Sequence, residues 1–173
     1  MTPFGDKENI VPNNNSFSQA LGTQDRDFLK LNIVGALDHV VHLVETQAGK
    51  LIVSSIENII YNIAQCDYEV WYKTCLKQQM EERLQSGNES AVVSGLRTLK
   101  AVIQAHEFEI HEDRRPLNDL MNTFFPELEK ILGSPVITQS SNYISTMILI
   151  AKIFFMTNQV SPITDLNEIY RAA

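Results

Sequence analysis

A few histidines and carboxylates are the residues in this chain whose spacing could support chemistry. His39 and His42 lie three residues apart, and Glu45 follows a turn later, a spacing that could hold a metal ion. No further ligand is evident near them, so ordinary surface or groove histidines explain the pattern better. The sequence therefore predicts no metal site.

The other candidates for chemistry carry weaker signals. Cys66 and Cys75 have no context that marks a nucleophile, and they are too few and too far apart for a disulfide framework or a metal knuckle. Acid pairs such as Glu81-Glu82 are typical of solvated surface, with nothing nearby to make one an acid and the other a base. The 7 glycines are scattered, so they form no phosphate-binding loop. We therefore expect no catalytic residue and no cofactor, and a protein that is not an enzyme.

Composition narrows the class of partner. The chain has 173 residues, of which 44% are hydrophobic and 20% charged, as in a globular domain with a sizeable core. Its net charge of −7 argues against direct binding of nucleic acid and favours basic protein partners, although a merely solvated acidic surface explains the charge equally well. The longest apolar run, from Met147 to Met156, is interrupted by Lys152 and is too short for membrane insertion.

An internal repeat is the strongest organising signal. The segment from Ile52 to Trp71 is an apolar helix that ends in an acidic-aromatic turn, and a similar segment from Ala91 to Glu109 follows about 40 residues later. A looser third copy covers Asn142 to Val160. Self-similarity at this period, with two helices in each period, indicates a HEAT or armadillo solenoid. The aligned pairs are Ile56 with Leu96, Ile59 with Leu99, Ile63 with Ile103, Asp67 with Glu107 and Tyr68 with Phe108.

Hydrophobic spacing divides the chain into paired helices. A polar arm or loop is expected at about 1–24, and a solenoid segment at about 25–173. The predicted fold is all-α, a right-handed α-solenoid (α-α superhelix) of about three HEAT repeats. The repeats are expected at about 25–66, 69–105 and 116–158, with a further one starting near 162. Their helices are expected at about 25–46, 50–66, 69–86, 90–105, 116–132 and 140–158.

Each helix is expected to bury one apolar stripe. The stripe of the first helix is Phe28, Leu31, Val34, Leu37, Val41 and Val44. That of the second is Ile52, Ile56, Ile59, Ile60 and Ile63. In the fourth helix Val92, Val93, Leu96, Leu99 and Ile103 should lie inside, and Ser94, Arg97, Thr98 and Ala101 outside.

Individual residues predict how several helices begin, bend and pack. Thr23 or Asp25 is expected to cap the first helix, and Asn88 or Ser90 the fourth. Pro126 is expected to kink or split the helix at about 116–132. The helix at about 140–158 is apolar nearly all round, so we expect neighbours to sandwich it.

A polar strip on the inner helices is the candidate site for a partner. In a solenoid such a strip lines the concave surface. A solvated face that contacts nothing explains the same pattern, because every such helix has an outer side. The candidate partner-binding residues are Ser54, Asn58, Tyr61 and Gln65 of the second helix, with Arg97 and Thr98 of the fourth.

Short motifs follow one another in order along residues 25–173. They are Leu31-Asn32-Ile33-Val34, the isoleucine-rich run from Ile56 to Ile63, Asp67-Tyr68 with Trp71, Leu96 and Leu99 with His106-Glu107-Phe108, Arg114-Arg115-Pro116-Leu117, Phe125-Pro126-Glu127-Leu128, and Lys152-Ile153-Phe154. In this order they resemble the amino-terminal HEAT repeats of nuclear transport receptors of the importin-β (karyopherin-β) superfamily. The resemblance is closest to the importin seven and eight subgroup.

The resemblance implies a binding scaffold that works in the cytoplasm and nucleus and at the nuclear pore of the nuclear envelope. The implied partners are the small GTPase Ran in its GTP form, basic cargo proteins such as ribosomal proteins or histones, and Phe-Gly nucleoporins. The family has repeats before and after the matched stretch, so the resemblance also implies a segment of a longer receptor. An exportin of the same superfamily, and a non-transport HEAT scaffold such as a phosphatase regulatory subunit, are the alternatives.

Overall fold

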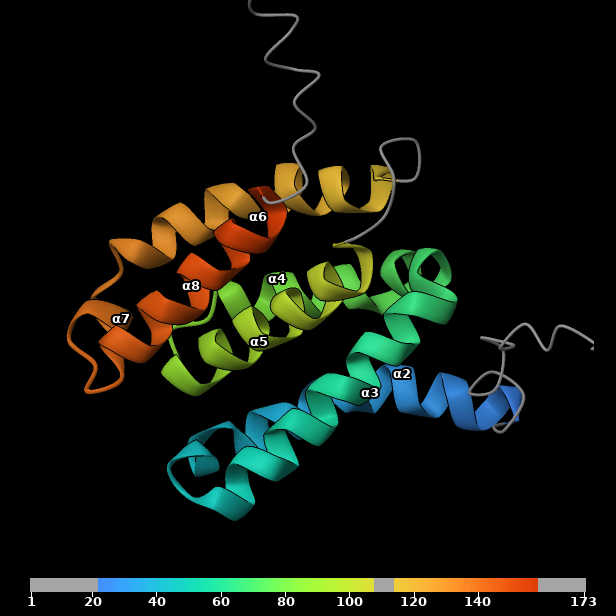
Figure 1. Ribbon diagram of the computed structural model, residues 1–173, viewed down its shortest axis with the longest axis horizontal. Helices are drawn as coiled ribbons and strands as arrows, with labels where there is room; N and C mark the ends of the chain where they lie inside the picture. The colour runs from blue at the N-terminus through green and yellow to red at the C-terminus, as the bar shows by residue number, and fades with distance from the viewer. Residues whose placement is uncertain (1–21, 108–113, 159–173) are drawn as a thin grey trace, which may run out of the picture.

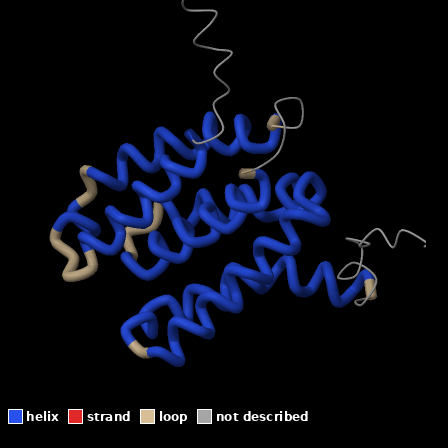
Figure 2. Tube along the Cα trace, viewed as in Figure 1, coloured by secondary structure: helices blue, strands red, loops and turns tan. Residues whose placement is uncertain are grey.

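The computed structural model describes residues 22–107 and 114–158, and every element within these ranges is helical (Figures 1 and 2). The predicted all-α class is therefore confirmed. Most of the predicted arm and the whole of the helix expected near 162 lie outside the described residues. The elements are α2 (Thr23–Val40), the 3-10 helix η1 (Val41–Glu45), α3 (Gln47–Trp71), the π-helical turn η2 (Tyr72–Leu76), α4 (Lys77–Leu84), α5 (Glu89–His106), α6 (Arg115–Leu132), α7 (Pro135–Thr138) and α8 (Tyr143–Asn158).

The helices stack in two layers. In one layer α3 contacts α5, and α5 contacts α8. In the other layer α2 contacts η2, and α4 contacts α6. α5 also contacts α2, α4 and α6, and it lies between the α2–α3 hairpin and the α6–α8 pair (Figure 1). This central position decides how much of α5 is available to a partner.

Side chains at the end of α3 and on α4 join these elements to α2. Trp71 Nε1, at the end of α3, donates to the Lys30 carbonyl at 3.1 Å, and Gln79 Nε2 donates to the Leu31 carbonyl at 2.9 Å. Further along, Arg83 makes a bidentate contact with Asp38, with Nε–Oδ1 at 2.9 Å and Nη2–Oδ2 at 2.6 Å. These contacts hold consecutive hairpins in one register, because a slip along α2 would break all of them together.

The predicted break near Asp67 is a kink inside a longer helical run. The chain stays helical from Gln47 to Leu84, but Asp67 itself has non-helical angles, with φ −139° and ψ 23°. Its carboxylate lies 3.0 Å from Lys30 Nζ, whose side chain is only 10% exposed. The sequence thus located the change of direction, while the prediction of two helices separated by a turn was wrong.

Two predicted apolar stripes are only partly buried. Buried as expected are Val34 and Leu37 on α2 and Val41 at the start of η1, but Phe28 is 69% and Leu31 59% exposed. On α3, Ile60 and Ile63 are buried as expected, but Ile52 is 44% exposed. Helical spacing defines a row of side chains, but the neighbouring helices decide which of two adjacent rows is covered. The covered residues that the prediction left out include Ile33 on α2, and Val53 and Ala64 on α3.

Three local expectations also need correction. α2 begins after Gly22 with no side-chain cap, so neither Thr23 nor Asp25 has that role. α6 is not split at Pro126 but runs through it. Pro126 has no N–H to donate to the Asn122 carbonyl, but both residues are exposed, so water can satisfy that carbonyl. The expected sandwiching of α8 is incomplete, because no described helix covers the face that carries Ile144, Ile148 and Phe155.

Candidate functional site

The α3 part of the predicted polar strip faces solvent. Ser54, Asn58 and Gln65 are exposed, and Tyr61 is half-buried. Their spacing of three or four residues places them in one row along the helix. Gln65 Nε2 donates to the Tyr61 hydroxyl at 2.6 Å, so two members of the row hold each other in position. This row is open to contact with a partner.

The α5 part of the strip is different. Thr98 is fully buried, and so are Ser94 and Ala101, so the prediction that these three residues face outward is wrong. α3, α4 and α8 all pack on α5 and leave it little free surface. At Gly95 the approach is so close that an added Cβ would lie 3.0 Å from Arg83 Cβ. Thr98 therefore cannot contact a partner in this fold.

Arg97 belongs to an ion-pair cluster between α3 and α5. Arg97 Nη1 lies 2.8 Å from Glu57 Oε1, and Lys100 Nζ lies 3.2 Å from Glu57 Oε2. The exposed fraction of the side chain is 23% for Arg97, 13% for Glu57 and 21% for Lys100. Sequence reasoning missed Glu57 and Lys100, although a signal existed. At the predicted repeat offset, Glu57 aligns with Arg97, and opposite charges at equivalent positions of neighbouring repeats favour an ion pair.

Replacing Glu57 with glutamine should destabilise the fold noticeably. The change leaves Arg97 and Lys100, both mostly buried, facing each other without a carboxylate. We expect the free energy of unfolding to fall by about 2 kcal/mol, between the values typical of exposed and of buried ion pairs. Urea denaturation followed by circular dichroism measures this change.

A matched control tests the cause of that effect. Glu69→Gln removes the same charge from α3, but Glu69 and Lys73 are 78% and 75% exposed and 3.5 Å apart. Its expected cost is below about 0.5 kcal/mol. Equal losses in the two variants would mean that the Glu57 cluster does not stabilise the α3–α5 contact.

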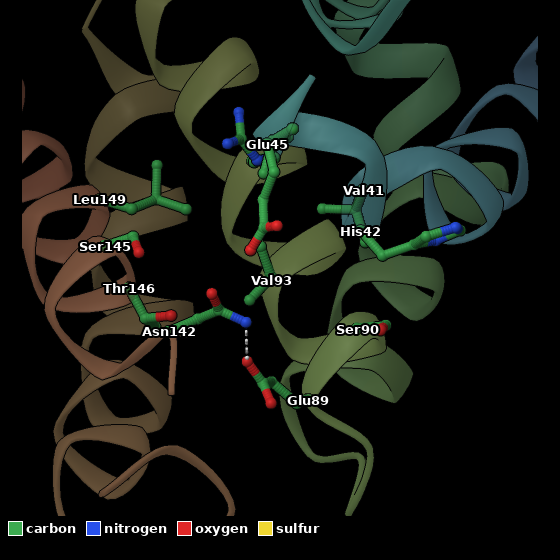
Figure 3. Close-up of a pocket in the computed structure, with 12 residues that line it drawn as sticks. Val41, His42, Glu45, Glu89, Ser90, Val93, Asn142, Ser145, Thr146 and Leu149 are labelled. Atoms are coloured by element: carbon green, nitrogen blue, oxygen red, sulfur yellow. Dashed lines mark hydrogen bonds between the residues drawn. The ribbon is translucent and has the colours of Figure 1, made fainter. Parts of the chain in front are cut away.

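A cleft opens beside this cluster. It has a volume of about 160 Å³ and lies between η1, α5 and α8 (Figure 3). The carboxylate of Glu89 on one side accepts hydrogen bonds from Ser140 Oγ at 2.6 Å and Asn142 Nδ2 at 2.9 Å. Of the sequence-predicted site residues, only Arg97 lines it. No local pattern could have located the cleft, because its walls come from three segments far apart in the sequence.

The histidines and cysteines of the described segments do not form a site together. His39 and His42 are both exposed, and His42 is one of the residues that line the cleft. Cys66 is exposed and Cys75 is partly buried. In residues 22–107 and 114–158, no group of three His, Cys, Asp or Glu side chains is placed to hold a metal ion. The helices described in the same ranges include none with the length and apolar character needed to cross a membrane.

Comparisons with known proteins assign no family. The chain matches no protein-family model, no curated protein and no solved structure. The features that bear on function are therefore the exposed row on α3, the Glu57 cluster and the adjoining cleft. All three lie on or between the helices of the α3–α5–α8 layer and the turn that precedes α3.

Proposed function

We propose that this chain is a segment of a nuclear transport receptor that binds Ran-GTP and protein cargo, with import of basic proteins as its role. The observation that carries the proposal is the ordered series of motifs across residues 25–173 that resembles the importin-β superfamily. The proposal includes Phe-Gly nucleoporins as partners and residence in the cytoplasm, the nucleus and the nuclear pore.

We further propose that the stacked hairpins are HEAT repeats of a right-handed solenoid, namely α2–α3, α4–α5 and α6–α8. Two kinds of contact support this assignment. Equivalent helices lie side by side in each layer. The contacts between them also join residues separated by about one repeat, such as Arg97 with Glu57 at 40 residues and Trp71 with Lys30 at 41.

Charge supports the choice of cargo. The chain has a net charge of −7, and an acidic surface attracts basic proteins and raises their rate of association. The exposed row of Ser54, Asn58, Tyr61 and Gln65 supplies hydrogen-bonding groups on the layer that would face the cargo. In a transport receptor, Ran-GTP binding would then release the cargo, because Ran-GTP and the cargo would each favour a different conformation of the receptor.

The test is nucleotide-dependent binding of Ran. The chain, and a version extended at its amino terminus, are each titrated with Ran loaded with GTP and with GDP. We expect the extended version to prefer the GTP form by at least about tenfold, within the usual range of coupling between two sites. Weak binding by the shorter chain would agree with a segment of a longer receptor. If neither version distinguishes the two nucleotide states, the transport proposal fails and a HEAT scaffold with other partners replaces it.

A further inference from the structure

Two carboxylates face the cleft between η1, α5 and α8. Figure 3 shows Glu45 and Glu89 directed toward its interior from opposite ends, with Val93 between them. Glu45 forms no ion pair with any described residue, and Glu89 accepts only from the neutral donors of Ser140 and Asn142 within the described ranges. Both negative charges therefore remain available to a cation from outside the described chain.

The hydroxyl of a nearly buried residue also opens into this cleft. Thr146 is only 2% exposed, yet it lines the cleft, and its hydroxyl makes no hydrogen bond to another residue in the described ranges. Asn142 uses its amide nitrogen on Glu89, which leaves its Oδ1 as an acceptor. An unpaired hydroxyl in a nearly buried position has its hydrogen-bonding capacity unused until a ligand or water fills it. Glu45, Glu89, Asn142 and Thr146 thus all offer the cleft an oxygen that can accept a hydrogen bond.

The remaining walls are aliphatic. Val41 and Val44 from η1, Val93 from α5 and Leu149 from α8 line the cleft. Arg97 is the one arginine or lysine among its described lining residues, and its Nη1 is paired with Glu57 at 2.8 Å. Lysine and arginine side chains combine an aliphatic stem with a cationic head, and they bury the stem along apolar surface while the head reaches polar groups.

We propose that this cleft binds a lysine or arginine side chain from a basic segment of a protein partner. The stem packs against the valines and Leu149, and the cationic head donates to one of the two carboxylates, Glu45 or Glu89, or to the Thr146 hydroxyl. Hydrogen bonds between charged groups are about twice as strong as neutral ones, which favours a cation over a neutral side chain here. The inference rests on the proposed function in taking basic cargo as the source of the segment, while the binding chemistry itself depends only on the cleft.

The probe is a terminally blocked, fluorescein-labelled peptide of Gly-Lys-Ser repeats, and the readout is its anisotropy at about 0.15 M salt. The double variant E45Q/E89Q should weaken binding at least about tenfold, equivalent to about 1.4 kcal/mol. The control D119N/E129Q makes the same change of charge at exposed residues of α6. It should weaken binding less than about threefold, because exposed charges act only through screened long-range attraction. Similar losses in both variants would show general acidity rather than a site.

A bulky substitution tests whether the peptide enters the cleft, without changing the charge of the cleft. Ser145 is exposed on the cleft wall, so Ser145→Phe should fill the cleft without disturbing the core, and we expect it to abolish most of the peptide binding. Asn118→Phe, at an exposed position on α6, is the matched control and should bind normally. Binding that survives Ser145→Phe would overturn the proposal.

Further peptides and one single variant complete the test. A peptide with norleucine in place of lysine keeps the stem but lacks the charge, so it should not bind, whereas an arginine peptide should.

Should Glu89→Gln disturb the start of α8, Glu45→Gln alone still tests the site, because Glu45 is exposed and makes no side-chain hydrogen bond to a described residue. Wild-type protein that fails to bind the lysine peptide refutes the cleft proposal. Peptide binding without nucleotide-dependent Ran binding keeps the cleft proposal and refutes the transport proposal.

Discussion

Replacing Trp71 with alanine is expected to lower the free energy of unfolding by about 3–5 kcal/mol, the usual cost of truncating a large aromatic side chain in a core. Trp71 is fully buried, one turn after the kink at Asp67, and it is the largest of the fully buried side chains. Alanine would leave a cavity between the α2–α3 hairpin and η2. It would also leave the Lys30 carbonyl without the indole donor that lies 3.1 Å away. Urea denaturation followed by circular dichroism measures the loss.

Two companion variants divide this effect into its parts. Trp71→Phe keeps most of the buried ring but removes the donor to Lys30, so it should cost about 1–3 kcal/mol. Val70→Ala truncates the neighbouring side chain, which is 60% exposed, and should change stability by less than about 0.5 kcal/mol. If Trp71→Ala were no more damaging than Val70→Ala, Trp71 would not anchor the contact between the hairpins.

Replacing Gly49 with alanine is expected to destabilise the protein by about 2–3 kcal/mol, as overpacking against a rigid neighbour does. Gly49 is buried in the first turn of α3, where its N–H donates to the N-capping hydroxyl of Thr46 at 3.0 Å. An added Cβ would overlap the Leu43 carbonyl oxygen and lie 2.5 Å from the carbonyl carbon. Backbone atoms cannot rotate away as a side chain can, so η1 and α3 would have to separate.

The matched control for Gly49 is Gly35 in the interior of α2. An added Cβ there would meet only the end of the Arg83 side chain, at 3.8 Å, and its φ is not positive. Alanine should therefore stabilise this position by about 0.5–1 kcal/mol, because it reduces the entropy of the unfolded chain. Thermal unfolding should show the two variants shifting the midpoint in opposite directions. Destabilisation of similar size in both would contradict the close approach of α3 to η1.

Local sequence signals were enough to predict where most helices lie. α5 and α6 begin and end within about two residues of their predicted bounds, a normal tolerance for helix ends. Asn88 caps α5, as predicted, by accepting from the Ala91 N–H at 3.2 Å, and Pro116 lies in the first turn of α6. Hydrophobic spacing, capping and proline geometry depend on residues within a few positions of one another, so the chain encodes them locally.

The side of each helix that is covered, and the residues that meet across helices, depend on the packing of the whole chain. Helical spacing predicted that Ile52 is buried and Thr98 exposed. In the folded chain Ile52 is exposed and Thr98 is buried, because the stacking of the helices determines which side of each helix is covered. The Glu57 cluster and the cleft between η1, α5 and α8 need side chains from separate helices. Their positions follow from the stacking of whole hairpins, because the row that a helix buries is set by the shape and packing of its neighbours rather than by its own periodicity.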